Sequence, residues 1–131
     1  MTQSSLARSW VASANGHSDF ALQNLPLGVF SHKGSAPRSG VAIGEHIFDL
    51  EAALAAGLFE GEAKAAVEAS LGGALNAFFA LGRSARVALR ERLLELFSEG
   101  STLRGKIEAQ GARLLPLACE CEMHLPAKIG D

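Results

Sequence analysis

Three short strand-like segments lie close together between residues 27 and 50, and they constrain the fold more than any other feature. Turn formers occupy residues 34–37, between the first segment and the second. The second connection is the pair Gly44-Glu45, where glycine can supply the positive φ of a tight type II′ hairpin. We therefore expect an antiparallel meander, with strands at about residues 27–31, 39–44 and 46–50.

Residue alternation indicates which sides of these strands are buried, because successive strand side chains point to opposite faces. Val41 and Ile43 share one face of the second strand, with Ala42 and Gly44 on the other. In the third strand His46, Phe48 and Leu50 oppose Ile47 and Asp49. Both faces are largely apolar, which favours a small closed or strongly curled barrel. Three strands cannot close a barrel, and the best candidate for another is "LLPLACECEMHLP", residues 114–126.

Helical segments occupy the middle of the chain. "DLEAALAAG" is typical of a short helix with Asp49 near its N-cap and Gly57 as its C-terminal stop. "LNAFFALG", residues 75–82, predicts a second helix, and residues 60–73 between the two fit either a short helix or an irregular excursion. Apolar residues recur at helical spacing over 84–100, which predicts the clearest helix. A further helical turn is expected within residues 102–117.

The charges of the clearest helix run against its dipole. Arginines lie toward its start, at residues 83, 86 and 90, and Glu95 and Glu99 lie toward its end. The helix dipole favours the opposite placement, so these charges are not there to stabilise the helix. A solvated helix face is the favoured interpretation, and a docking patch for another domain is the alternative.

Bulk properties exclude several classes of protein. The chain has 131 residues, a formal charge of -2 and a pI near 6.1, which suits one domain and gives no basic footprint for nucleic acid. No apolar run could span a membrane, and the N-terminus lacks the pattern of a secretory signal. Two cysteines are too few and too close to staple a secreted fold, so we expect free thiols and a cytoplasmic setting. Residues 1–18 lack an apolar period and are expected to be a flexible segment, loose or laid over the surface.

The stretch from Cys119 to His124 invites a metal-site interpretation. On a strand, Cys119, Cys121 and Met123 would face one way and the other candidate ligands the opposite way. A zinc site usually needs four ligands in two separated pairs, and the chain offers no second pair. Ordinary buried thiols are therefore the favoured interpretation.

The histidines do not suggest a catalytic triad. His17, His32 and His46 are expected in a loose segment, a turn and a hairpin end, and surface positions are the favoured interpretation. None has a Ser or Cys in nucleophile-elbow context, and no Gly-rich stretch has the spacing of a phosphate loop. A carboxylate at Asp131, just after a glycine, could help to hold Mg²⁺ or Ca²⁺, but one carboxylate is not a site. From the residues alone, an exposed chain end is favoured for Asp131.

Three stretches together resemble one family: "DFALQNLPLGVFS", "RSGVAIGEHIFDL" and "MHLPAKIGD". Their order and spacing are similar to the N-terminal part of fumarylacetoacetase, also called fumarylacetoacetate hydrolase, from about Asp19 to Asp131. The middle of the chain, residues 52–118, matches mostly in helical character. The resemblance implies an α+β fold, a small Src-homology-3-like β-barrel with attached α-helices, followed in the complete enzyme by a larger catalytic domain.

The resemblance also implies an activity. Family members hydrolyse the carbon-carbon bond of 4-fumarylacetoacetate to fumarate and acetoacetate, in tyrosine and phenylalanine breakdown, with a divalent Ca²⁺ or Mg²⁺. The Asp of the "IGD" motif, the family's first metal ligand, matches Asp131. The catalytic histidine of the family follows that motif, and none of His17, His32, His46 and His124 matches it.

We therefore expect residues 19–126 to form the N-terminal domain and residues 127–131 to begin the linker to the catalytic domain. The chain alone is expected to be inactive and to bind no metal. Its expected partner is the catalytic domain of the same enzyme. The full-length enzyme is expected to be a homodimer that binds the diketo acid substrate. The alternative is a stand-alone interaction or self-association module without catalytic activity, using apolar surface that the catalytic domain would otherwise cover.

Overall fold

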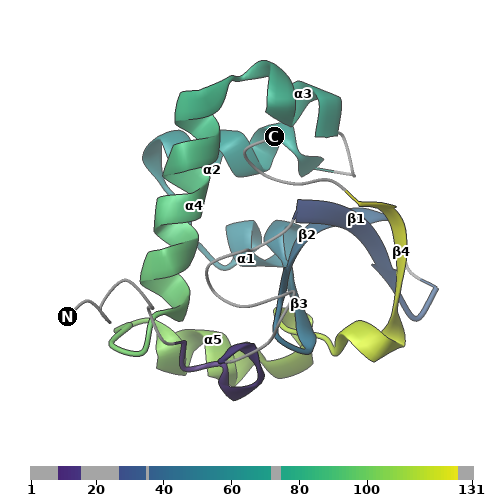
Figure 1. Ribbon diagram of the computed structural model, residues 1–131, viewed down its shortest axis with the longest axis vertical. Helices are drawn as coiled ribbons and strands as arrows, with labels where there is room; N and C mark the ends of the chain where they lie inside the picture. Colours follow the sequence, from purple (N-terminus) through teal and green to yellow (C-terminus); the bar gives the residue numbers. More distant parts are fainter. Residues whose placement is uncertain (1–8, 16–26, 35, 72–74, 127–131) are drawn as a thin grey trace.

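Figure 1 shows the computed structural model, in which residues 9–15, 27–34, 36–71 and 75–126 are described. A curled antiparallel sheet lies beside a group of helices, so the domain belongs to the α+β class. The strands are β1 (Leu27–His32), β2 (Arg38–Ile43), β3 (His46–Asp49) and β4 (Cys121–Pro126). The α-helices are α1 (Leu50–Ala55), α2 (Gly61–Ala69), α3 (Leu75–Ala80), α4 (Arg83–Phe97) and α5 (Arg104–Gln110). Short 3₁₀ helices are η2 (Ala12–Ala14), η4 (Gly111–Arg113) and η5 (Ala118–Glu120).

The sheet has the order β3-β2-β1-β4, and its neighbouring strands are antiparallel. The predicted meander is therefore confirmed, with strand ends within a residue of those expected. Gly44 has a φ of 58°, whereas Glu45 is not among the residues with positive φ. This combination fits a type II′ hairpin better than type I′, which needs positive φ at both positions.

One stretch of chain, residues 114–126, pairs with both outer strands of the meander. Its first part lies along β3: the amides of Asp49 and Ile47 donate to the carbonyls of Leu114 and Pro116, each at 2.9 Å. The amide of Ala118 then donates to the carbonyl of Glu45 at 2.8 Å. After η5 the chain crosses to the other side and forms β4, which pairs with β1 from His32↔Cys121 to Gly28↔Pro126. This stretch therefore covers the outer edges of both β3 and β1, and the sheet curls as predicted (Figure 1).

Both faces of the sheet are buried, as the alternation predicted. The helix-facing side belongs to the main hydrophobic core and contributes Leu27, Val41, Ile43, Phe48 and Leu50. The opposite, concave side forms a second small cluster of Phe30, Ala42 and Ile47. Ala118 of η5 and Cys121 of β4 pack against this second cluster and help to shelter it.

Asp49 joins the sheet to the first helix. Its side chain is 8% exposed. One carboxylate oxygen accepts from the Ala52 amide at 3.0 Å, and the other accepts from Arg38 at 2.8 Å. The first bond is the predicted N-cap of α1. The helix ends before Gly57, whose φ is 80°, as predicted for its stop.

The remaining helices cover the helix-facing side of the sheet. Residues 60–73, left open from the sequence, contain α2. The predicted apolar stripe of α4 is buried, comprising Ala85, Leu89, Leu93, Leu96 and Phe97. Phe97 meets Phe48 of β3 edge to face, with ring centroids 4.7 Å apart. No helix in the described part of the chain has both the length and the hydrophobicity needed to cross a membrane.

The segment before the first strand packs on the domain over residues 9–15. The Trp10 indole nitrogen donates to the carbonyl of Leu96 at 2.8 Å, and Val11 is 5% exposed in the main core. Residues 9–15 are therefore packed on the domain, where the sequence predicted a segment that is loose or laid over the surface.

Gly40 provides the first test of this packing. A Cβ added there would lie 2.6 Å from Phe30 Cε1 and 2.8 Å from Ile47 Cγ2, closer than van der Waals contact allows. We expect Gly40→Ala to lower the free energy of unfolding by about 1–3 kcal/mol because it overpacks the concave cluster. Urea unfolding measures this change.

The matched control is Gly105→Ala on α5, where an added Cβ meets nothing within 4 Å. That variant should keep or raise the stability, by up to about 1 kcal/mol, through helix propensity. A Gly40→Ala protein as stable as the parent would show that the concave cluster is not packed as described.

Candidate functional site

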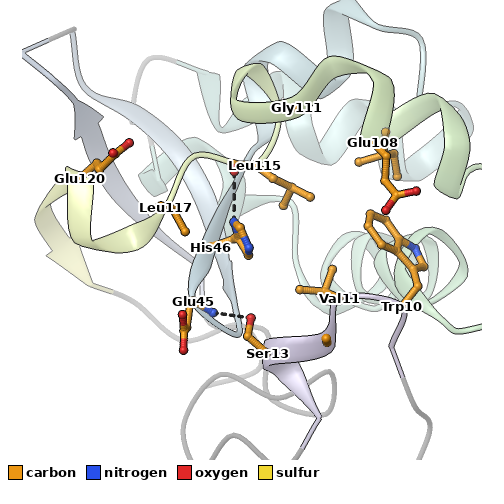
Figure 2. Close-up of a pocket in the computed structure, with 12 residues that line it drawn as sticks. Trp10, Val11, Ser13, Glu45, His46, Glu108, Gly111, Leu115, Leu117 and Glu120 are labelled. Carbon is orange, nitrogen blue, oxygen red and sulfur yellow. Dashed lines mark hydrogen bonds between the residues drawn. The ribbon is translucent and has the colours of Figure 1, made fainter.

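A groove lies where η2, the β2–β3 turn, α5 and residues 115–120 meet (Figure 2). Its volume is about 620 Å³. Most of its wall is apolar, and a histidine and three glutamates add polar groups. The lining residues are Trp10, Val11, Ala12, Ser13, Glu45, His46, Ile107, Glu108, Gly111, Leu115, Leu117 and Glu120.

His46 is the central polar group of the groove and is half-buried, where the sequence predicted a surface position at a hairpin end. Its Nδ1 lies 3.1 Å from the carbonyl oxygen of Leu115, which can only accept, so Nδ1 carries the proton. Ser13 Oγ accepts from the Glu45 amide at 2.9 Å. Figure 2 shows these as two separate bonds, so the imidazole and the hydroxyl do not form a nucleophile–base pair.

Two of the three glutamates of the groove are paired with cations. Glu108 accepts from Arg104 at 3.2 Å, and the Arg104 guanidinium carbon lies 5.6 Å from the centre of the Trp10 ring. Glu120 lies 3.4 Å from His32 and 3.9 Å from Lys33. The Arg104–Glu108 pair lies within α5, and the contacts of Glu120 join η5 to the end of β1. Ion pairs exposed in this way contribute little to stability.

The predicted metal ligand lies outside the described residues. Asp131 and His17 belong to the parts of the chain that the structure does not describe, and so does the side chain of His124. Across residues 9–15, 27–34, 36–71 and 75–126, no three His, Cys, Asp or Glu side chains gather as a metal site would require.

The two cysteines differ from the prediction in burial and in placement. Cys119 lies in η5 and is exposed, and Cys121 begins β4 and is half-buried; both are free thiols. Within the candidate stretch 114–126, β4 starts only at Cys121, because the chain first turns from β3 toward β1. Cys119 is therefore not one of the ordinary buried thiols expected.

Burial raises the pKa of the Cys121 thiol above its ordinary value, and the neighbouring Glu120 carboxylate raises it further. A raised pKa keeps the thiol protonated at neutral pH, which weakens it both as a nucleophile and as a metal ligand. The Cys121 sulfur also donates to the carbonyl of Leu117 at 3.4 Å. Cys121 is therefore a weaker candidate than an ordinary thiol for a nucleophile or a metal ligand.

The structure is a small α+β domain in which a curled four-stranded antiparallel sheet lies beside helices. A family model described as "Fumarylacetoacetase N-terminal" matches residues 23–126. The chain belongs to the fumarylacetoacetase family, as its N-terminal domain.

Curated relatives named fumarylacetoacetase agree with this assignment. The chain is 43% identical to the Caenorhabditis elegans protein over 117 residues, which is 88% of this chain and 28% of the relative. It is 38% identical to the Oryza sativa protein over 128 residues, 95% of this chain and 30% of the relative. The Homo sapiens protein is 39% identical over 117 residues, 87% of this chain and 27% of the relative. The chain thus spans less than a third of the length of these relatives.

The groove was missed by reasoning from the sequence. Trp10 is the single tryptophan of the chain, and an isolated large aromatic in a polar segment is a signal of packing that could have been used. The bond from His46 to Leu115 joins residues 69 positions apart, and no local pattern predicts such a contact.

The two thiols should react at different rates. We expect Cys119 to react at least several-fold faster than Cys121 with a thiol reagent at pH 7, because it is exposed and Cys121 has a raised pKa. The reaction of Cys121 should accelerate only at a higher pH than that of a free thiol. Cys119→Ser and Cys121→Ser variants separate the two rates by mass spectrometry.

A chain unfolded in urea is the control, since the difference between the thiols should shrink there. Faster labelling of Cys121 than of Cys119 in the folded protein would contradict the described burial.

Proposed function

We propose that this chain is the N-terminal domain of an enzyme that hydrolyses the carbon-carbon bond of 4-fumarylacetoacetate to fumarate and acetoacetate, in cytoplasmic tyrosine and phenylalanine breakdown. The match of residues 23–126 to the N-terminal family model carries the proposal. Relatives that are 34–43% identical over most of this chain are named fumarylacetoacetase, which supports it.

In this proposal the domain supports the catalytic domain and supplies one metal ligand, Asp131. The pairing of β4 with β1 supports this role, because it fixes the position of Pro126. Asp131 follows Pro126 by only five positions in the sequence. The described residues do not fit a complete Ca²⁺ or Mg²⁺ site, because no three candidate ligands gather among them. One carboxylate supplies at most two of the 6–8 oxygens that Ca²⁺ takes. The chain alone would therefore be inactive.

Finer features of the fold and assembly belong to the same proposal. The curled sheet with both edges covered supports a Src-homology-3-like barrel over a domain that spans residues 19–126, with 127–131 beginning the linker. The full-length enzyme would be a homodimer, and its substrate would be a small diketo acid and not a nucleic acid.

A stand-alone interaction module remains the second candidate. Leu81, Val87 and Leu117 are large apolar side chains that are 39–46% exposed, which favours some covering partner. The two candidates differ in whether the domain contributes to hydrolysis, so an activity measurement separates them.

A chimera tests the proposal. Residues 1–131 replace the matched N-terminal part of the Caenorhabditis elegans relative, and hydrolysis of the diketo acid is followed by its ultraviolet absorbance. We expect activity within about tenfold of the parent relative, and Asp131→Ala should lower it by at least 10²-fold as a metal ligand is lost.

The remaining part of the relative, expressed without any N-terminal domain, is the control for the contribution of residues 1–131. Asp131→Ala should also raise the Ca²⁺ or Mg²⁺ concentration needed for half-maximal activity. A folded but inactive chimera, or an Asp131→Ala variant with parental activity and metal dependence, would contradict the proposal.

A further inference from the structure

The first turn of α4 carries positive charge at the end of the helix where charge of this sign is unfavourable. Arg83 is exposed and Arg86 half-buried, and no acidic residue lies in the first turn. The N-cap is Gly82, which offers no side-chain acceptor to the free amides. Arginines next to the positive end of the helix dipole weaken the helix, so folding of this domain does not explain their presence.

These arginines also differ from three other arginines of the described residues in lacking an ion pair. Arg38, Arg92 and Arg104 each form an ion pair with a carboxylate, at 2.8–3.3 Å. Within the described ranges neither Arg83 nor Arg86 has one, and Arg86 Nε is shielded from solvent with no hydrogen-bond acceptor. Glu62 on the neighbouring α2 instead accepts from Ser84 at 2.7 Å. A buried donor without an acceptor is costly, which adds to the cost of placing an arginine at this position. No described carboxylate of this surface pairs with the guanidinium groups of Arg83 and Arg86, and a carboxylate of a partner could do so.

Apolar side chains accompany the two arginines. Leu81 is 46% exposed and Val87 is 39% exposed, and Val87 lies one helical turn after Arg83. We call Leu81, Arg83, Arg86 and Val87 the α4 surface. Apolar side chains mixed with arginine are typical of protein interfaces, where arginine pairs with carboxylates in bidentate fashion.

The position of the α4 surface indicates what covers it. In Figure 1, α3 and the start of α4 lie at the upper end of the molecule, and β4 runs toward that end. β4 finishes at Pro126, opposite Gly28 of β1. Since the matched family region is N-terminal and spans under a third of the relatives, their remaining polypeptide follows from this end.

We propose that the α4 surface docks onto the catalytic domain that follows residue 131 in the enzyme, on a patch where carboxylates lie beside apolar side chains. This inference rests on the proposed function, because the catalytic domain that would cover the α4 surface is part of that proposal. The catalytic domain would then supply the acceptors for Arg86 and Arg83 and cover Leu81 and Val87.

Charge reversal in the chimera tests the proposal. We expect Arg83→Glu combined with Arg86→Glu to lower the chimera's melting temperature by at least 5 °C. In the two-part system, the dissociation constant between the 131-residue chain and the remaining part of the relative should rise at least tenfold. Raising the salt concentration should weaken the parental pair more than the variant pair, since charge pairing is screened.

Two controls separate docking from folding. Lys106→Glu combined with Arg113→Glu makes the same charge change on exposed residues at α5 and η4, and should leave binding unchanged. The reversed 131-residue chain alone should melt no lower than the parent, because glutamate suits the start of a helix. Leu81→Ser is a milder second variant and should weaken binding without altering the chain's own melting.

Each failure has a distinct meaning. If the chimera is active but the charge reversal changes neither its melting temperature nor the dissociation constant of the two-part system, the α4 surface is not the docking surface. The proposed function would then still stand. No binding between the parental parts, together with an inactive chimera, would overturn both. Self-association of the parental chain that the reversal abolishes, with no effect on the two-part system, would assign the surface to a second copy and overturn the proposal.

Discussion

The pairing of residues 114–126 with both outer strands is the constraint on which the rest of the structure depends. A three-stranded meander with two apolar faces would leave either its concave cluster or its edges in water. The amides of Ile47 and Asp49 bond to the first part of this stretch, and β1 bonds to the second. This stretch also shelters the small cluster around Phe30, since Ala118 and Cys121 pack against it.

The same stretch of chain takes part in the hydrogen bonds that Asp49 makes with three parts of the fold. Its amide is held by Leu114, one carboxylate oxygen caps α1, and the other holds Arg38 of β2. Asp49 thereby fixes α1 to the sheet, and residues 114–126 hold the two outer strands of the meander in the curled arrangement. For a domain that is proposed to position polypeptide beyond Pro126, a rigid connection from the core to β4 is the relevant property.

Local signals in the sequence predicted local structure well. Gly44 predicted the tight hairpin, and Asp49 and Gly57 predicted the ends of α1, because each acts through backbone bonds within a few residues. The burial of both sheet faces followed from alternation. The α+β class and the curled sheet could thus be read from the sequence.

Contacts between distant residues could not be predicted in the same way. The anchoring of Trp10 on Leu96 and the bond from His46 to Leu115 depend on how the finished elements pack. Cys119 was expected on a buried strand, yet the crossing from β3 to β1 places it in an exposed 3₁₀ turn. The groove around His46 could not be predicted for the same reason, because elements far apart in the sequence assemble it.

Amide hydrogen exchange measured residue by residue tests the closure of the sheet most directly. The Ile47 and Asp49 amides point toward residues 114–116, away from β2, and should be protected as strongly as interior amides of the β1–β2 pair. Exchange of these two amides at the rate of an unstructured peptide, while β1 and β2 stay protected, would contradict the account.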